Sequence, residues 1–209
     1  MPADPNRVIL TGENPFIRLS VNDGDPFTTN ASFWRIITCP AGPGHVLYLN
    51  SELTGNRWRI YADNIAMARW LQSTVQGMLN PETADPSIPV TEAQFTKSGD
   101  PQYFWTEGVK SRDEEIGLTW YQIGEPLLIH TQPNAEPGRP YGVCTLLIPA
   151  LGARLTRNGV EAAGRRTGAA RLHQGAVHPR EHVDQALHQR AADTDEAVHH
   201  GHLRSEADC

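Results

Sequence analysis

The sequence predicts a mainly β domain with one helix (α+β), arranged as an antiparallel barrel or sandwich and followed by a polar C-terminal tail. Short segments rich in β-branched and aromatic residues alternate with turn signals over most of residues 7–156. One segment, residues 64–80, instead has apolar residues at helical spacing. All aromatic residues lie before residue 157, which sets the folded part apart from the tail.

The first half of the folded part reads as a strand meander. Residues 7–12 and 16–21 are short apolar segments, and residues 33–40 and 44–51 are two more strands joined by a Gly/Pro turn. Residues 56–63 alternate, which is typical of a half-buried antiparallel strand. One face would carry Trp58, Ile60 and Ala62, and the other Arg57, Arg59 and Tyr61.

The predicted helix covers residues 64–80. Asp63 or Asn64 is placed to cap its first amides, and Pro81 ends it. A single apolar stripe indicates a helix that packs on a sheet as a lid or prop. The stripe consists of Ile65, Ala68, Leu71, Val75 and Met78.

Strand patterns return after a Pro-rich connector at residues 80–89. Strands are expected at 93–99, 102–110, 115–124, 126–132 and within 141–159. About eight to ten short strands with one helix favour an up-and-down, lipocalin-like barrel over a βαβ arrangement, with a sandwich as the alternative. This likeness concerns architecture alone and implies no activity.

A domain boundary is expected at residue 156, with residues 157–209 forming a His/Arg/Ala-rich tail. The tail has no aromatic residue and no Ile, Met or Lys, so it cannot bury enough apolar area to offset the entropy of ordering its backbone. We therefore expect it to be disordered. Its composition resembles GC-rich DNA translated in a shifted frame, and such a tail would replace the last strand or strands and leave the barrel incomplete.

Seven of the nine histidines lie in this tail. The pair His178 and His182 and the cluster His199, His200 and His202 have chelating spacing. Zinc sites need ligands held by a folded frame, and the tail offers no apolar residues to build one. No metal site is predicted.

Composition narrows the function class. The net charge is −6 and Lys97 and Lys110 are the only lysines, which argues against nucleic acid as a partner. Neither a membrane-spanning segment nor a secretory signal is recognisable, so the expected compartment is the cytoplasm. No phosphate loop, nucleophile elbow, zincin or paired-cysteine motif occurs, so no cofactor is predicted. The oligomeric state is left open.

The first functional hypothesis is a small-molecule-binding protein with an aromatic-lined cavity. Trp58, Trp105 and Trp120 are expected to line it, although large aromatics on strands also serve as plain core. Arg35 and Arg59 offer planar donor forks for an anionic ligand, unless they are solvated on the outer face.

The second hypothesis is a cofactor-independent enzyme: a hydrolase, lyase or isomerase. His130 ends a strand and would act as general base, assisted by Glu107 or Tyr61. Glu107 lies inside a predicted strand, where burial would perturb its pKa. The alternative for His130 is a hydrogen-bonded rim residue, and His45 is interpreted as a turn residue.

Overall fold

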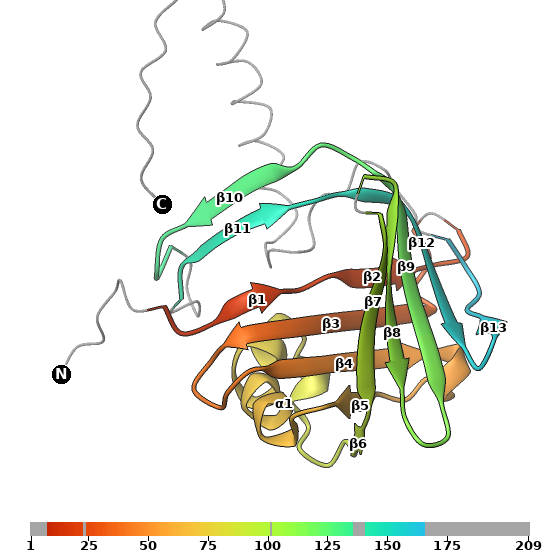
Figure 1. The fold of residues 1–209 in the computed structure, drawn as a ribbon, viewed down its shortest axis with the longest axis horizontal. Helices are drawn as coiled ribbons and strands as arrows, with labels where there is room; N and C mark the ends of the chain where they lie inside the picture. The colour runs from red at the N-terminus through yellow and green to blue at the C-terminus, as the bar shows by residue number, and fades with distance from the viewer. Residues whose placement is uncertain (1–7, 23, 101, 136–140, 166–209) are drawn as a thin grey trace, which may run out of the picture. The chain divides into compact units, whose positions relative to one another are not determined.

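The computed structural model describes residues 8–22, 24–100, 102–135 and 141–165. These residues fall into two compact units, one formed by residues up to Leu127 together with those from Ile148 onward, and the other by residues within Leu128–Leu147. The predicted class, mainly β with one helical stretch and antiparallel sheets, is confirmed (Figure 1). Within the described residues, no helix has both the length and the apolar character needed to cross a bilayer.

The first sheet of the larger unit has the order β1-β3-β4-β5-β6, and β2 also pairs with β3. All its pairs are antiparallel except β5 and β6, which run parallel. Its strands are β1 (Thr11–Glu13), β2 (Phe16–Leu19), β3 (Thr29–Thr38), β4 (Gly44–Ser51), β5 (Arg59–Ala62) and β6 (Val90–Glu92).

The second sheet of this unit has the order β13-β12-β9-β8-β7 and is antiparallel throughout. Its strands are β7 (Gln94–Asp100), β8 (Phe104–Lys110), β9 (Glu115–Ile123), β12 (Ala150–Arg157) and β13 (Val160–Glu161). Between residues that the structure describes, an isolated bridge joins Ser20, after β2 of the first sheet, to Arg165, after β13 of the second.

The two sheets pack face to face around one apolar core. Alternate residues of each strand point inward, as the period of two requires. The unit is therefore a sandwich, and the closed barrel favoured by the sequence is not formed by the described strands. The largest buried residues of this core are Ile17, Leu19, Phe33, Leu47, Leu49, Tyr61, Ile116, Leu118 and Trp120.

A helical stretch covers the other face of the first sheet. It runs through α1 (Ile65–Leu71), the π-helical turn η2 (Gln72–Gln76) and α2 (Gly77–Leu79), within the predicted residues 64–80. Of the predicted stripe, Ala68 and Leu71 are buried, whereas Ile65 is half exposed and Met67 is buried instead. The Asn64 side chain caps it by accepting from the Met67 amide at 3.1 Å. A second core forms beneath it, and its members include Trp34, Val46, Tyr48, Ile60, Met67 and Leu71.

The helical stretch, followed by the 3₁₀ turn η3 (Pro81–Ala84), carries the chain from β5 to the parallel strand β6. The sequence prediction missed β6, because its three residues follow a Pro-rich connector and show too short a pattern. It also missed η1 (Glu52–Thr54), a 3₁₀ turn capped by Ser51.

The folded sheet extends beyond the predicted boundary at residue 156. Residue 156 lies inside β12, β13 pairs with β12, and Ala162 is buried in the core between the sheets. The backbones of Ser20 and Arg165 exchange two hydrogen bonds of 3.0 and 3.2 Å. The predictions of a disordered or frameshifted tail and of its histidines fall mainly on residues 166–209, which lie outside the described residues.

The smaller unit contains a two-stranded sheet, β10 (Leu127–Thr131) paired with β11 (Val143–Leu147). Both strands were expected from the sequence. His130 lies on β10 and its side chain is exposed.

The role of residues 157–165 can be tested by truncation. A chain ending at Thr156 should be less stable than one ending at Arg165 by about 3 kcal/mol or more, because it loses the β13 pairing, the burial of Ala162 and several hydrogen bonds. Urea denaturation followed by circular dichroism measures the difference. Equal stabilities would show that the sheet does not depend on these residues.

Candidate functional site

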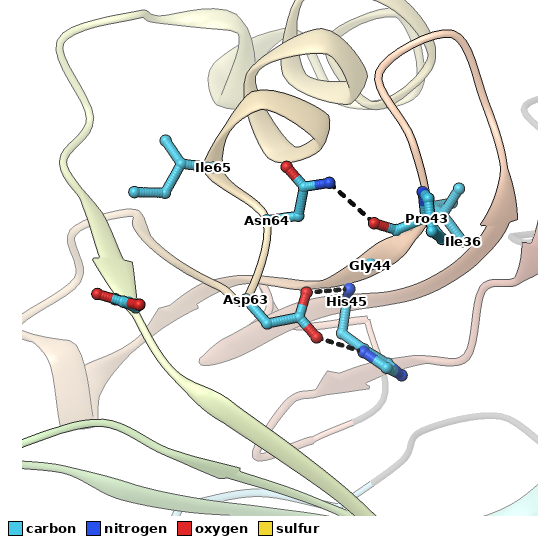
Figure 2. Close-up of a pocket in the computed structure, with 8 residues that line it drawn as sticks. Ile36, Pro43, Gly44, His45, Asp63, Asn64 and Ile65 are labelled. Carbon is cyan, nitrogen blue, oxygen red and sulfur yellow. Dashed lines mark hydrogen bonds and ion pairs between the residues drawn. The ribbon is translucent and has the colours of Figure 1, made fainter.

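An open pocket of about 750 Å³ lies where β4 begins and β5 passes into α1 (Figure 2). Its wall combines apolar side chains with two carboxylates, an amide and an imidazole. The lining residues are Ile36, Pro43, Gly44, His45, Asp63, Asn64, Ile65 and Glu92.

His45 and Asp63 form the polar centre of this pocket. Val46 pairs with Ala62 in the antiparallel register of β4 and β5, so the next position along brings His45 opposite Asp63. The Asp63 carboxylate accepts from the His45 backbone amide at 2.6 Å and contacts the ring Nδ1 at 2.6 Å (Figure 2). The carboxylate thus holds both the backbone and the ring of His45.

Arg35 determines the tautomer of His45. Its Nε–H donates to His45 Nε2 at 3.1 Å, and since an arginine can only donate, Nε2 must be the unprotonated nitrogen. The ring proton therefore sits on Nδ1, where it is donated to Asp63. The ring also stacks on Phe95, with centroids 5.2 Å apart. His45 is consequently fixed on three sides.

The rest of the Arg35 side chain reaches across the sandwich to Glu107 on β8. Arg35 Nη2 lies 2.9 Å from the Glu107 carboxylate, and Nη1 lies 2.8 Å from Glu13. Lys97 lies 3.0 Å from Glu13 and 3.8 Å from Glu107. The Glu107 side chain is only 1% exposed, and burial raises its pKa although Arg35 and Lys97 oppose that shift.

A continuous chain of polar contacts thus runs from the pocket into the core, in the order Asp63, His45, Arg35 and Glu107. In this arrangement His45 Nε2 is occupied by Arg35, so the ring orients a polar wall and is not poised as a free base. Glu92 differs, because its carboxylate has no hydrogen bond or ion pair within the described residues. It is the acceptor most available to a bound molecule.

A second charged network surrounds Glu114, which precedes β9. Its carboxylate accepts from the Tyr61 hydroxyl at 2.5 Å and from Arg59 at 3.1 Å, and it also pairs with Arg157. Burial opposes ionisation of Glu114, but the hydrogen bonds from Tyr61 and Arg157 and the two positive charges outweigh it and lower its pKa. Burial, with the bond to Glu114, raises the pKa of Tyr61.

Arg59 and Tyr61 were predicted as ligand-clamping and catalytic residues. The structure brings them together, but around the Glu114 carboxylate of this same chain. They line neither the pocket beside His45 nor a second, smaller pocket that Trp58 borders. Arg35 likewise pairs with Glu107 and Glu13. Their roles in binding a ligand stay predictions.

The three tryptophans predicted to line a cavity occupy different places. Trp105 and Trp120 pack in the core between the sheets with their rings 5.7 Å apart, and Trp120 donates to the Phe16 carbonyl at 3.0 Å. Trp58 lies on the helix-covered face and borders a smaller pocket of about 230 Å³. Only Trp58 therefore borders either of these two pockets.

The predicted catalytic group is divided between the units. His130 belongs to the smaller unit, whereas Glu107 and Tyr61 belong to the larger one. Glu107 and Tyr61 themselves join two different networks, with Arg35 and with Glu114. The acid–base role of His130 stays a prediction.

His45 and Asp63 were not recognised as site residues from the sequence. His45 was interpreted as a turn residue, and Asp63 was considered only as one of two candidate helix caps, of which Asn64 is the one used. Pairing residues 44–51 with 59–62 in an antiparallel register would have placed the two side chains opposite each other.

In the part of the chain that the structure describes, no three His, Cys, Asp or Glu side chains gather in a way that could hold a metal ion. Comparisons with protein-family models, curated proteins and solved structures find no match, so function must be argued from the geometry.

The Arg35–Glu107 pair should behave as a buried ion pair. Arg35→Met should lower the free energy of unfolding by about 3 kcal/mol near neutral pH, because it leaves the Glu107 charge buried beside Lys97 alone. The pKa of Glu107 is raised in the folded protein, which means that the fold destabilises the ionised carboxylate relative to the neutral carboxyl. The loss should therefore shrink as the pH falls below that pKa and the carboxyl becomes neutral.

Denaturant unfolding of the Arg35→Met protein at several pH values measures this effect. The double variant Arg35→Met/Glu107→Leu should recover most of the loss, whereas Arg154→Met, at an exposed arginine of β12, should change little. A pH-independent loss in Arg35→Met would contradict the assignment.

Glu114 should contribute stability with the opposite pH dependence. Its pKa is lowered in the fold, so its stabilising effect is complete above the ordinary carboxyl pKa and is lost as the pH falls through the lowered value. Glu114→Gln should cost about 2 kcal/mol at neutral pH and much less in acid. The neighbouring exposed Glu115→Gln is the control, and thermal unfolding across pH distinguishes the two.

Proposed function

We propose that the larger unit is a small-molecule-binding protein whose ligand occupies the pocket beside His45 and Asp63. The observation that carries this proposal is the fixed polar wall: Asp63 holds His45, and Arg35 and Phe95 fix the ring from other sides. These pre-oriented polar groups lie beside apolar side chains in an open pocket of about 750 Å³, which gives a small molecule both polar and apolar contacts. The cytoplasm, and a small molecule in preference to nucleic acid, remain the proposed compartment and partner class on grounds of composition.

The lining favours a ligand with hydrogen-bond donors or a positive charge. Asp63 and Glu92 contribute carboxylates to the wall, and its described lining residues include no lysine or arginine. The anionic ligand expected from the sequence relied on Arg35 and Arg59, whose guanidinium groups pair with Glu107 and Glu114. We therefore favour an amine or another donor-rich molecule with an apolar part that contacts Ile36 and Ile65.

A cofactor-independent enzyme is the second candidate. The Asp63–His45 contact of 2.6 Å favours it, because a carboxylate that orients an imidazole is a recurrent acid–base device. In this version His45, not His130, is the base, and a substrate must draw Arg35 away from Nε2 before the ring can accept a proton. Turnover that requires both His45 and Asp63 would favour the enzyme over the carrier.

The proposal is tested by screening amine-containing and neutral metabolites against the isotopically labelled protein by NMR. Binding should shift the backbone amides of Gly44, Asn64 and Ile65. Ile65→Trp should fill the pocket and abolish these shifts, because Ile65 is half exposed at its wall. Ile37→Trp is the matched control, since Ile37 is exposed on β3 and does not line the pocket.

Two results would count against this proposal. The first is a full screen in which no compound shifts the pocket amides. The second is a ligand that binds Ile65→Trp as tightly as it binds the unaltered protein.

A further inference from the structure

A second, smaller pocket of about 230 Å³ opens elsewhere on the larger unit. It is lined by Phe27, Asn30, Asn50, Trp58 and Glu82. These residues come from the loop before β3, from β3, from β4, from the segment just before β5 and from η3. Five separate parts of the fold therefore converge on it, and none of its residues lines the His45 pocket.

The floor of this pocket is a pair of asparagine amides. Asn30 and Asn50 are direct cross-strand partners on β3 and β4, so their side chains project from the same face of the sheet. Both residues are half-buried, yet neither side-chain amide makes a hydrogen bond within the described residues. A primary amide offers two donor hydrogens and an accepting oxygen, so the floor presents donors and acceptors side by side.

The walls are an oriented tryptophan and a carboxylate. The Trp58 indole N–H donates to Glu82 Oε2 at 3.0 Å, which holds the ring, while Trp58 also packs against the core under the helix. The second Glu82 oxygen has no partner among the described residues. Phe27 also borders the pocket and is about half exposed, but the Arg18 guanidinium lies over its ring, 5.6 Å from the ring centre. Trp58 is therefore the aromatic ring better placed to contact a ligand.

These groups match the chemistry of a sugar ring. Vicinal hydroxyls both donate and accept, as the two amides and the free carboxylate oxygen require, and the C–H face of a pyranose packs on an aromatic ring. Among the described residues, no cationic side chain is in the pocket lining, although the Arg18 guanidinium carbon lies 5.6 Å from the centre of the neighbouring Phe27 ring. The volume lies below the range typical of drug-sized ligands, so a single ring fits it better than a larger molecule.

We propose that Asn30, Asn50, Trp58 and Glu82 form a binding site for one pyranose ring, distinct from the His45 pocket. The amides bind the hydroxyls of the sugar, Glu82 accepts from a further hydroxyl, and Trp58 stacks against the C–H face. The ring can be a free monosaccharide or the end of a glycan, since both present the same hydroxyl pattern.

The test is an NMR titration of the labelled full chain with glucose, galactose, mannose and N-acetylglucosamine, each free and as the terminal ring of an oligosaccharide. At least one should shift the Trp58 indole signal and the side-chain amide signals of Asn30 and Asn50 at millimolar concentration. The Gly44 and Asn64 amides should stay unchanged, which separates this site from the His45 pocket. Tighter binding of the free or the chain-terminal form identifies the source.

Variants localise the site. Asn50→Ala and Asn30→Ala should each weaken binding at least about tenfold, whereas Gln94→Ala, which removes an exposed amide on β7, should leave it unchanged. The shifts in the unaltered protein provide a readout that does not depend on the folding of any variant. The proposal is overturned if no sugar moves these signals, or if adenosine or uridine moves them and no sugar does.

Discussion

The buried carboxylate of Glu107 is the constraint on which the rest of the site depends. A charge taken out of water between two sheets is tolerated only beside compensating charges, and Arg35 and Lys97 supply them. Once Arg35 is committed to Glu107, its Nε–H points to His45 and leaves the ring proton on the side of Asp63. The need to compensate the buried Glu107 charge thus fixes Arg35, and through Arg35 it fixes the orientation of His45 in the pocket wall.

The two sheets are joined at two places by charged networks of opposite character. Around Glu107 burial dominates and the pKa of the carboxyl rises, whereas around Glu114 the bonds from Tyr61 and Arg157 dominate and the pKa falls. The inward-facing arginines are consequently occupied by the protein itself. The polar side chains that line the two pockets are mainly carboxylates and amides. For this reason both proposed ligands are rich in hydrogen-bond donors.

The predicted site was correct in some residues and incomplete in others. Arg35 and Glu107 were singled out separately, and the structure brings them into contact. Arg59 and Tyr61 were predicted to share a face, and they do, but their partner Glu114 was not among the predicted site residues. His45 and Asp63 were missed because their significance lies in the register between β4 and β5, which no local pattern reveals.

The sequence by itself determined the class of fold, most strands and the helix, because alternation and helical spacing are local properties that each segment carries alone. It did not determine the parallel strand β6, the open sandwich in place of a closed barrel, or the extension of the sheet to Arg165. Those features depend on contacts between residues that are far apart in the sequence. The same holds for the two ion pairs: Arg35 and Glu107 are 72 positions apart, and Arg59 and Glu114 are 55 positions apart. Only tertiary structure decides which charges meet, because a buried charge selects its partner by proximity in space and not by distance along the chain.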